Sequence, residues 1–224
     1  MGDVAMTVPV VYSLAHQYPD LRISVLSRPF AKAFFSHMPK NVDFIAADLK
    51  NEYKGIKGLN QLYGRLKAKQ PTAIADFHDV LRSKYIRTRF TLCGYKTAHI
   101  DKHKNGKRKL CRQKDKVMEQ QPTSFQNYAE VLSKLGYPID LSFTSLFANG
   151  GNQLSQLPNI IGEKNNGERW IGIAPFAAHN GKMYPKEKME EVVKVLSTEY
   201  SNLRIFFFGG GKEEKQILNT WATK

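Results

Sequence analysis

Residues 170–211 read WIGIAPFAAHNGKMYPKEKMEEVVKVLSTEYSNLRIFFFGGG, and this stretch decides the fold class. Residues 171–175 are typical of a short buried strand, which runs into a loop of small and polar residues at 176–181. Pro185 suits the first turn of a helix, because no backbone N–H is needed there. A second apolar strand at 203–208 ends in three glycines. The order strand, loop, helix, strand predicts a βαβ unit.

This unit has the features of a site that binds anions. A loop of small residues leaves backbone N–H groups free, and the start of a helix adds a positive field that favours phosphate. A lysine closes the loop, while the glycine turn and the acids after it suit close approach of a nucleotide and its ribose hydroxyls. The same pattern also describes a βαβ unit that binds nothing, whose acids only start a helix. The candidate donor-site residues are Ala177, Ala178, Lys182, Gly209, Gly210, Glu213 and Glu214.

Composition sets limits on the class of protein. The chain has 224 residues, of which 42% are hydrophobic and 24% charged, as in ordinary globular domains. The sequence contains no apolar run of membrane-spanning length and no signal-peptide pattern. Cys93 and Cys111 show neither metal-ligand spacing nor a disulfide framework. We therefore expect a cytoplasmic protein without a metal or cofactor.

The net charge is strongly positive. Thirty-four Lys and Arg residues against twenty Asp and Glu residues give a formal charge of +14. Such an excess predicts a polyanionic neighbour, which is a nucleic acid, an anionic membrane surface or a phosphorylated substrate. Charge alone does not choose among the three.

The rest of the chain alternates predicted strands and helices, which favours a mostly parallel sheet covered on both faces. A linker rich in Asn, Gly, Gln and Ser at 147–167 divides an N-terminal domain, 1–150, from a C-terminal domain, 151–224. The predicted helices lie at 4–18, 30–37, 59–69, 80–92 and 123–135, and the predicted strands at 22–26, 42–45 and 73–77.

Residues 102–116 form the basic centre of the chain, with eight Lys or Arg residues and a single acid. Gly106 and the lack of apolar periodicity predict a loop. One interpretation is a solvated surface loop, and the other is an electrostatic clamp for a phosphorylated acceptor. The acceptor-binding candidates are Arg82, Lys84, Lys104, Lys107 and Arg108.

Both ends of the chain depart from a regular parallel sheet. Such a sheet starts with a strand, yet a predicted helix begins three residues into this sequence. The second half contains only two strands and two helices. We expect the first strand of the first domain to be missing and the second domain to be incomplete.

Three stretches, taken in order, resemble the lipopolysaccharide heptosyltransferases of glycosyltransferase family 9. Residues 1–20, MGDVAMTVPVVYSLAHQYPD, are similar to the Gly-Asp motif and helix of that family. Residues 75–90, ADFHDVLRSKYIRTRF, are similar to its strand, short turn and Leu-Arg-Ser helix. The donor half is represented by IGIAPFAAHNGKMYPKEKMEEVVKVL at 171–196 and FFFGGGKEE at 206–214.

The resemblance implies an α/β fold of GT-B type, in which two Rossmann-like domains face a cleft and the second is incomplete here. It implies transfer of a heptose, with inversion, from ADP-heptose to a lipopolysaccharide core acceptor, an acidic glycolipid. The enzyme would work on the cytoplasmic, inner face of the bacterial inner membrane, peripherally attached and without a metal. Two details depart from the family, which has hydroxyl residues at Ala177 and Ala178 and Lys-Arg-Trp-Pro or Lys-His-Trp-Pro at 182–185.

The resemblance also assigns roles within the reaction. Asp3 would be the base that takes the acceptor proton, although an aspartate so placed also suits a helix N-cap. Lys182 would neutralise the charge that grows on the leaving diphosphate. Two rival functions remain open. One is a transferase that uses another nucleotide sugar, and the other is a basic nucleic-acid-binding protein, against which the segment 102–116 carries no stacking aromatic residue.

Overall fold

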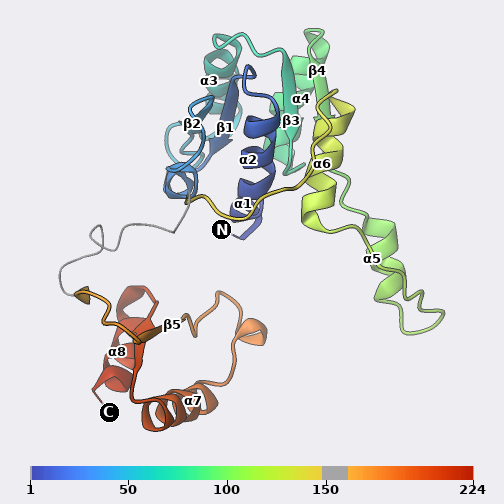
Figure 1. Cartoon of the computed structure of the whole chain (residues 1–224). Helices are drawn as coiled ribbons and strands as arrows, with labels where there is room; N and C mark the ends of the chain where they lie inside the picture. The colour runs from blue at the N-terminus through green and yellow to red at the C-terminus, as the bar shows by residue number, and fades with distance from the viewer. Residues whose placement is uncertain (1, 148–160, 224) are drawn as a thin grey trace. The chain divides into compact units, whose positions relative to one another are not determined.

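The computed structural model describes residues 2–147 and 161–223, and the chain forms two compact units, 1–151 and 152–224 (Figure 1). Most of the expected linker, at 148–160, lies outside the described residues. The roles that the resemblance implies, acceptor binding by the first domain and nucleotide-sugar binding by the second, stay predictions.

Unit 1 alternates helices and strands, as predicted. Its elements are α1 (Gly2–Ala5), α2 (Val8–Gln17), β1 (Ile23–Ser27), the 3-10 helix η1 (Pro29–Phe35), β2 (Val42–Ala46), α3 (Gly55–Lys67), β3 (Ala73–Asp76), α4 (Leu81–Leu92), β4 (Lys96–His99), α5 (Lys104–Leu110) and α6 (Ser124–Lys134).

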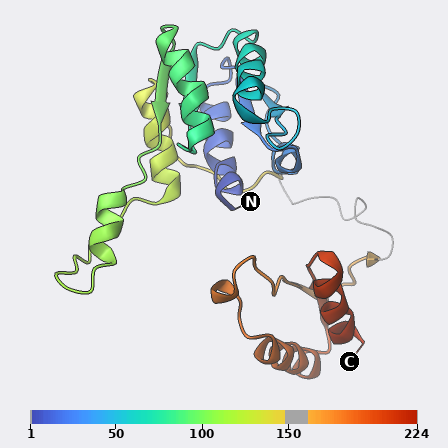
Figure 2. The same cartoon turned by 180° about the vertical axis from the view of Figure 1, so that it is seen from behind.

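The sheet of unit 1 consists of two parallel pairs. β1 pairs with β2 from Ile23 opposite Val42, and β3 pairs with β4 from Ala73 opposite Lys96. Among the described strands β1 has no hydrogen-bonded neighbour except β2, and β3 has none except β4. Helix α2 lies between the two pairs in Figures 1 and 2, and the cluster around its Val10 includes both Ile23 and Ala73. This arrangement fits a Rossmann-like sheet without a strand between β1 and β3.

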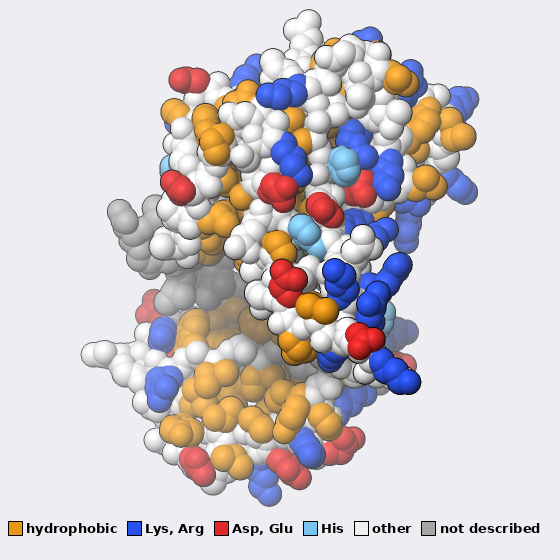
Figure 3. All heavy atoms as spheres, turned by 90° about the vertical axis from the view of Figure 1, so that its right-hand side faces the viewer, with side chains coloured by type: hydrophobic (Ala, Val, Ile, Leu, Met, Phe, Trp, Pro, Cys, Tyr) orange, Lys and Arg blue, Asp and Glu red, His pale blue; other side chains and the backbone are white. Residues whose placement is uncertain are grey.

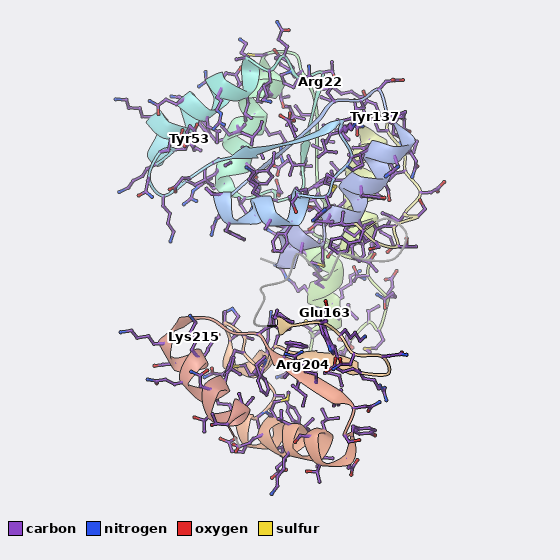
Figure 4. The ribbon with its side chains drawn as sticks, turned by 60° about the vertical axis from the view of Figure 1, so that its left-hand side comes forward. Arg22, Tyr53, Tyr137, Glu163, Arg204 and Lys215 are labelled. Carbon is purple, nitrogen blue, oxygen red and sulfur yellow. The ribbon has the colours of Figure 1, made fainter. Side chains whose placement is uncertain are left out.

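The core of unit 1 is made of the apolar faces of its helices. Val10 of α2 and Val131 of α6 are buried in the same hydrophobic cluster. Phe90 of α4 is fully buried in a second cluster, beneath α3. Tyr18 and Tyr137, the latter labelled in Figure 4, meet edge to face with ring centroids 5.4 Å apart. One cluster therefore joins α2 to α6, and the other joins α3 to α4.

Two local expectations for unit 1 fail at its first helix and its fourth strand. The helix expected at 4–18 ends close to the predicted place but is broken into α1 and α2, because Pro9 has no N–H to donate to the carbonyl four residues earlier. Thr7 instead donates from its hydroxyl to the Val4 carbonyl at 2.7 Å. Strand β4 was not predicted, since Lys96 and Thr97 hide its short apolar signal.

The expected loop at 102–116 is wrong in its first half, which forms helix α5. Lys and Arg are good helix formers, and an exposed helix needs no apolar periodicity. Gly106 lies inside α5, where an added Cβ would collide with the side chain of Gln121. The glycine therefore allows the returning chain to pack against the helix.

Unit 2 is the predicted βαβ unit with one further helix. Its elements are β5 (Arg169–Ile173), the 3-10 turn η4 (Asn180–Lys182), α7 (Lys186–Glu199), β6 (Leu203–Phe207) and α8 (Gly211–Ala222). β5 and β6 are parallel. Pro185 is the N-cap of α7 rather than a residue of its first turn. Arg204, labelled in Figure 4, lies over the Trp170 and Phe206 rings at 5.8 and 5.2 Å from their centroids.

Among the described residues, no helix has both the length and the apolar character needed to cross a bilayer.

Two glycines of α3 give a matched test of packing. A Cβ at Gly58 would collide with the backbone of Tyr53, whereas a Cβ at Gly64 would meet nothing within 4 Å. We expect Gly58→Ala to lower the free energy of unfolding by about 1–3 kcal/mol, the usual cost of overpacking. Gly64→Ala should raise it by up to about 1 kcal/mol, because alanine favours the helix. Urea unfolding followed by circular dichroism measures both, and equal effects would contradict the packing of α3 on Tyr53.

Candidate functional site

The candidate donor site lies where β5 and β6 end, at the carboxyl edge of their parallel pair. The loop after β5 meets the glycine turn after β6, since a Cβ at Gly209 would lie 3.4 Å from Cδ2 of Phe176 and 2.8 Å from Cδ1 of Leu218. Phe176 also stacks on Trp221 of α8, with ring centroids 6.5 Å apart. The two predicted halves of the nucleotide site are therefore neighbours within unit 2.

The loop after β5 offers free backbone donors. The N–H groups of Ala177, Ala178 and His179 have no acceptor within the described part of the chain. The N–H of Lys182 donates to the His179 carbonyl at 2.9 Å and closes the turn η4. The Lys182 side chain is exposed and has no ion-pair partner among the described residues. A flexible cation beside free N–H groups can hold phosphate oxygens.

The glycine turn leads directly into α8. Gly211 has a φ of +78°, which suits glycine, and the Gly210 N–H donates to Oε2 of Glu214 at 2.7 Å. Glu214 thus accepts a backbone N–H at the start of α8. This agrees, for Glu214, with the alternative interpretation that the two acids only start a helix. Glu213 is exposed and forms no ion pair with another described residue. The loop after β5 does not lead directly into α7, because the turn η4 comes first. The helix that begins at this edge is α8, whose N-terminus carries a partial positive charge.

In unit 1 the carboxyl end of β3 carries a buried ionic cluster that was not predicted from the sequence. Asp76 is 6% exposed and accepts hydrogen bonds from the N–H groups of His78 at 3.0 Å and Asp79 at 2.8 Å. Arg87 of α4 donates to Asp76 at 2.8 Å and to Asp79 at 3.0 Å. An aspartate that ends an apolar strand, with an arginine on the next helix, was the available signal.

Asp79 interacts with two further cations at this edge, Lys84 and Lys102. Lys84 lies 3.4 Å from its carboxylate, and the Lys102 ammonium donates to its carbonyl at 3.1 Å. Burial alone would raise the pKa of Asp79, but the hydrogen bond from Arg87 and the charge of Lys84 outweigh it and lower the pKa. Lys84, a candidate for acceptor binding, is thus already paired, whereas Arg82 is exposed.

Asp3 is exposed in the first turn of α1, and the structure gives it no capping hydrogen bond. Its carbonyl accepts a hydrogen bond from the hydroxyl of Tyr128 at 3.4 Å. Burial raises the pKa of Tyr128, and the negative charge of Asp3 adds to the effect. The Tyr128 ring lies 4.9 Å from that of Phe77, the residue that follows β3. Asp3 therefore lies at the same edge of unit 1 as the ionic cluster.

Next to this edge is an open hollow of about 830 Å³ at the end of β4. His99, Asp101 and Lys104 line it, together with Asp79 and Lys134. The walls offer cations, carboxylates and neutral donors together, which suits a ligand with hydroxyl and acidic groups. Of the basic candidates on α5, Lys104 lines the hollow, and Lys107 and Arg108 do not.

The described residues contain no group of three or more His, Cys, Asp or Glu side chains placed to hold a metal ion. A cleft that would bring Asp3 and Lys182 together involves both units and stays a prediction.

Comparisons with known proteins bear on the fold. No protein-family model matches the sequence, and no curated protein matches it. A solved glycosyltransferase of family 9 from Veillonella parvula is similar over 97% of this chain and 62% of its own, with a TM-score of 0.68 and 19% identity. The E. coli heptosyltransferase WaaC with ADP is similar over 99% of this chain and 68% of its own, at 0.65 and 17%.

The same E. coli enzyme with ADP-2-deoxy-2-fluoro heptose gives a TM-score of 0.66 at 18% identity, over 99% of this chain and 70% of the enzyme. These similarities confirm the predicted fold class, an α/β fold of GT-B type with an incomplete second part. The chain spans 62% of the length of the Veillonella protein.

The buried cluster at β3 gives a test of structure and pH dependence. We expect Arg87→Ala to cost about 3 kcal/mol of unfolding free energy, because it leaves the buried Asp76 carboxylate without its cation. Arg82→Ala, on the same helix but exposed, should change it by less than about 0.5 kcal/mol.

The sign of the pH effect follows from Asp79. Its pKa is lowered by folding, so its stabilising contribution is complete above its ordinary value of 3.8 and is lost as the pH falls through the lower folded value. Arg87→Ala removes the hydrogen bond that is the largest cause of that lowering and leaves Lys84 in place, so acid unfolding should begin at a higher pH than in the unchanged chain. An unaltered acid midpoint would show that Arg87 does not stabilise the ionised carboxylate.

Proposed function

We propose that this chain belongs to the lipopolysaccharide heptosyltransferases and moves a heptose from ADP-heptose to a lipopolysaccharide core acceptor with inversion. The observation that carries the proposal is the fold similarity, which extends over nearly the whole chain to a family 9 glycosyltransferase and to a heptosyltransferase with ADP. The candidate donor site supports it, because free N–H groups and a lysine meet a glycine turn at one edge of unit 2.

The donor nucleotide is held by unit 2 in this proposal. The N–H groups of Ala177 and Ala178, with the Lys182 ammonium, bind the diphosphate and stabilise its charge as it leaves. Gly209 and Gly210 let the nucleotide approach the backbone, and Glu213 accepts a hydrogen bond from the ribose. Glu214 acts through α8, whose first turn it holds in place.

The acceptor is held by unit 1. Its hydroxyl oxygen attacks the anomeric carbon, the bond from that carbon to the diphosphate oxygen breaks, and the Asp3 carboxylate takes the hydroxyl proton. ADP leaves with the bonding electron pair. The hollow beside β4 offers Lys104 and Asp101 to the acidic and hydroxyl groups of the acceptor, and Arg82 is exposed nearby on α4. The reaction takes place in the cytoplasm.

A transferase with a different nucleotide sugar is the second candidate. The observation that favours it is the pair of methyl side chains at Ala177 and Ala178, which provide no hydroxyl to the diphosphate. A ligand that binds only the folded chain raises its melting temperature. A larger shift with ADP than with UDP or GDP would support the heptosyltransferase, and the reverse order would favour the second candidate.

Loss of the lysine charge should weaken nucleotide binding. We expect Lys182→Ala to raise the Kd for ADP by roughly 5- to 150-fold, which is the loss of about 1–3 kcal/mol from a charge-assisted hydrogen bond. Lys194→Ala on the exposed face of α7 is the matched control and should leave the Kd unchanged. Isothermal titration of ADP measures both, and equal Kd values for the two variants would remove Lys182 from the donor site.

Loss of the proposed base should abolish transfer without unfolding the chain. We expect Asp3→Asn to lower kcat by about 10²–10⁴-fold, the usual contribution of a general base. The melting temperature should stay within about 2 °C, because Asp3 is exposed and its contact with Tyr128 uses the backbone. Asp20→Asn, also exposed, is the control. Heptose transfer from radiolabelled donor is the assay, and an unchanged kcat would exclude Asp3 as the base.

A further inference from the structure

A basic arm projects from unit 1 between β4 and α6. We define the arm as residues 102–122, which run outward along α5 and return beside it (Figure 1). Two contacts hold the returning chain against the helix: the Val117 N–H donates to the Lys109 carbonyl at 3.4 Å, and Gln121 packs on Gly106. The arm carries one short helix and none of the buried residues of the unit 1 core, and long connections of this kind are often functional.

The charge of the arm is largely unpaired. Lys102 is bonded to the Asp79 carbonyl, but the other seven Lys and Arg residues of 102–116 form no ion pair within the described residues. Figure 3, which faces the side of α5, shows Lys and Arg side chains gathered there. All residues from Cys111 to Gln120 are exposed. These cations are free to meet an anionic surface.

The far end of the arm also exposes apolar side chains. Met118 is 79% exposed and Val117 is 43% exposed, directly after the last lysine of the basic run. Exposed apolar residues that continue a cationic segment are a typical feature of surfaces that enter the headgroup region of a bilayer. Neither side chain belongs to the hydrophobic clusters of unit 1 among the described residues.

We propose that the arm docks the chain on an anionic lipid bilayer. Apart from Lys104, which lines the hollow beside β4, the unpaired cations lie along the headgroups, where anionic lipids attract basic residues within a Debye length of the surface. Val117 and Met118 enter the boundary between headgroups and acyl chains. The arm thereby attaches unit 1 to the membrane without a helix that crosses it.

A single-stranded RNA is the other polyanion that a +14 chain could meet. RNA binding of this kind relies on aromatic side chains on which bases stack. The arm contains no Phe, Tyr or Trp between residues 102 and 122, and its exposed apolar residues are aliphatic. These side chains favour lipid over RNA.

The test measures binding of the whole chain to sedimented vesicles, with no nucleotide sugar and no glycolipid present. We expect binding to phosphatidylcholine vesicles that contain phosphatidylserine, weak binding to phosphatidylcholine alone, and a steep decrease as salt is raised. The double variant Arg112→Glu/Lys114→Glu should lose about tenfold or more in partition coefficient. The matched control Lys57→Glu/Lys67→Glu changes the net charge equally on exposed positions of α3 and should lose much less.

A second variant tests the apolar contact. Met118→Ser should weaken binding by several-fold, and the loss should persist at a salt concentration that screens the charges. Equal losses in the arm and control variants would overturn the proposal, because net charge alone would then explain binding. Failure to bind phosphatidylserine vesicles, or binding to single-stranded RNA in preference to them, would overturn it as well. Because no sugar donor is used, the outcome is independent of the proposed transferase activity.

Discussion

Parallel pairing of short strands is the constraint on which the rest of the structure depends. In a parallel pair, both strands end at the same edge, so the loops that follow them become neighbours. In unit 2 this brings Phe176 against Gly209. In unit 1 it places Asp76 of β3 next to the end of β4 and its hollow. The candidate donor site of unit 2 and the edge of β3 and β4 in unit 1 are therefore each formed by residues that are separated in the sequence.

Burial decides which charged residues at these edges remain available to a ligand. Asp76 is almost fully buried, and an ionised carboxylate in that position requires a cation and hydrogen-bond donors. Arg87 and two backbone N–H groups provide them. Lys84 is drawn into the same cluster by Asp79, whereas Lys182 and Glu213 in unit 2 stay exposed and unpaired among the described residues. Because Asp76 and Asp79 pair with Arg87 and Lys84, fewer charged residues remain available to a ligand than the sequence suggests.

The two units differ in how they use glycine and charge at helix starts. Gly211 takes a positive φ so that α8 can begin directly after β6, and Glu214 satisfies the first N–H. The arm of unit 1 instead uses Gly106 within α5 so that Gln121 can pack on it. In the first case the glycine lies at the start of a helix, and in the second it leaves room for the side chain of Gln121. Both positions were visible as glycines, but their uses depend on partners far along the chain.

The sequence by itself determined the alternation of strands and helices and the βαβ unit at 170–211, because these depend on local periodicity, proline and glycine. The GT-B type of the fold was implied by the resemblance of three stretches to a family and not by their periodicity. Its failures occurred where local signals are weak: β4 is short and polar, and α5 is a helix without an apolar face. Only the tertiary structure decided that Arg87 pairs with Asp76, that Glu214 serves its own helix, and that Lys104 rather than Lys107 lines the hollow. The physical reason is that a charged side chain is committed by the groups packed around it, and parallel strands bring those groups together from separate parts of the chain.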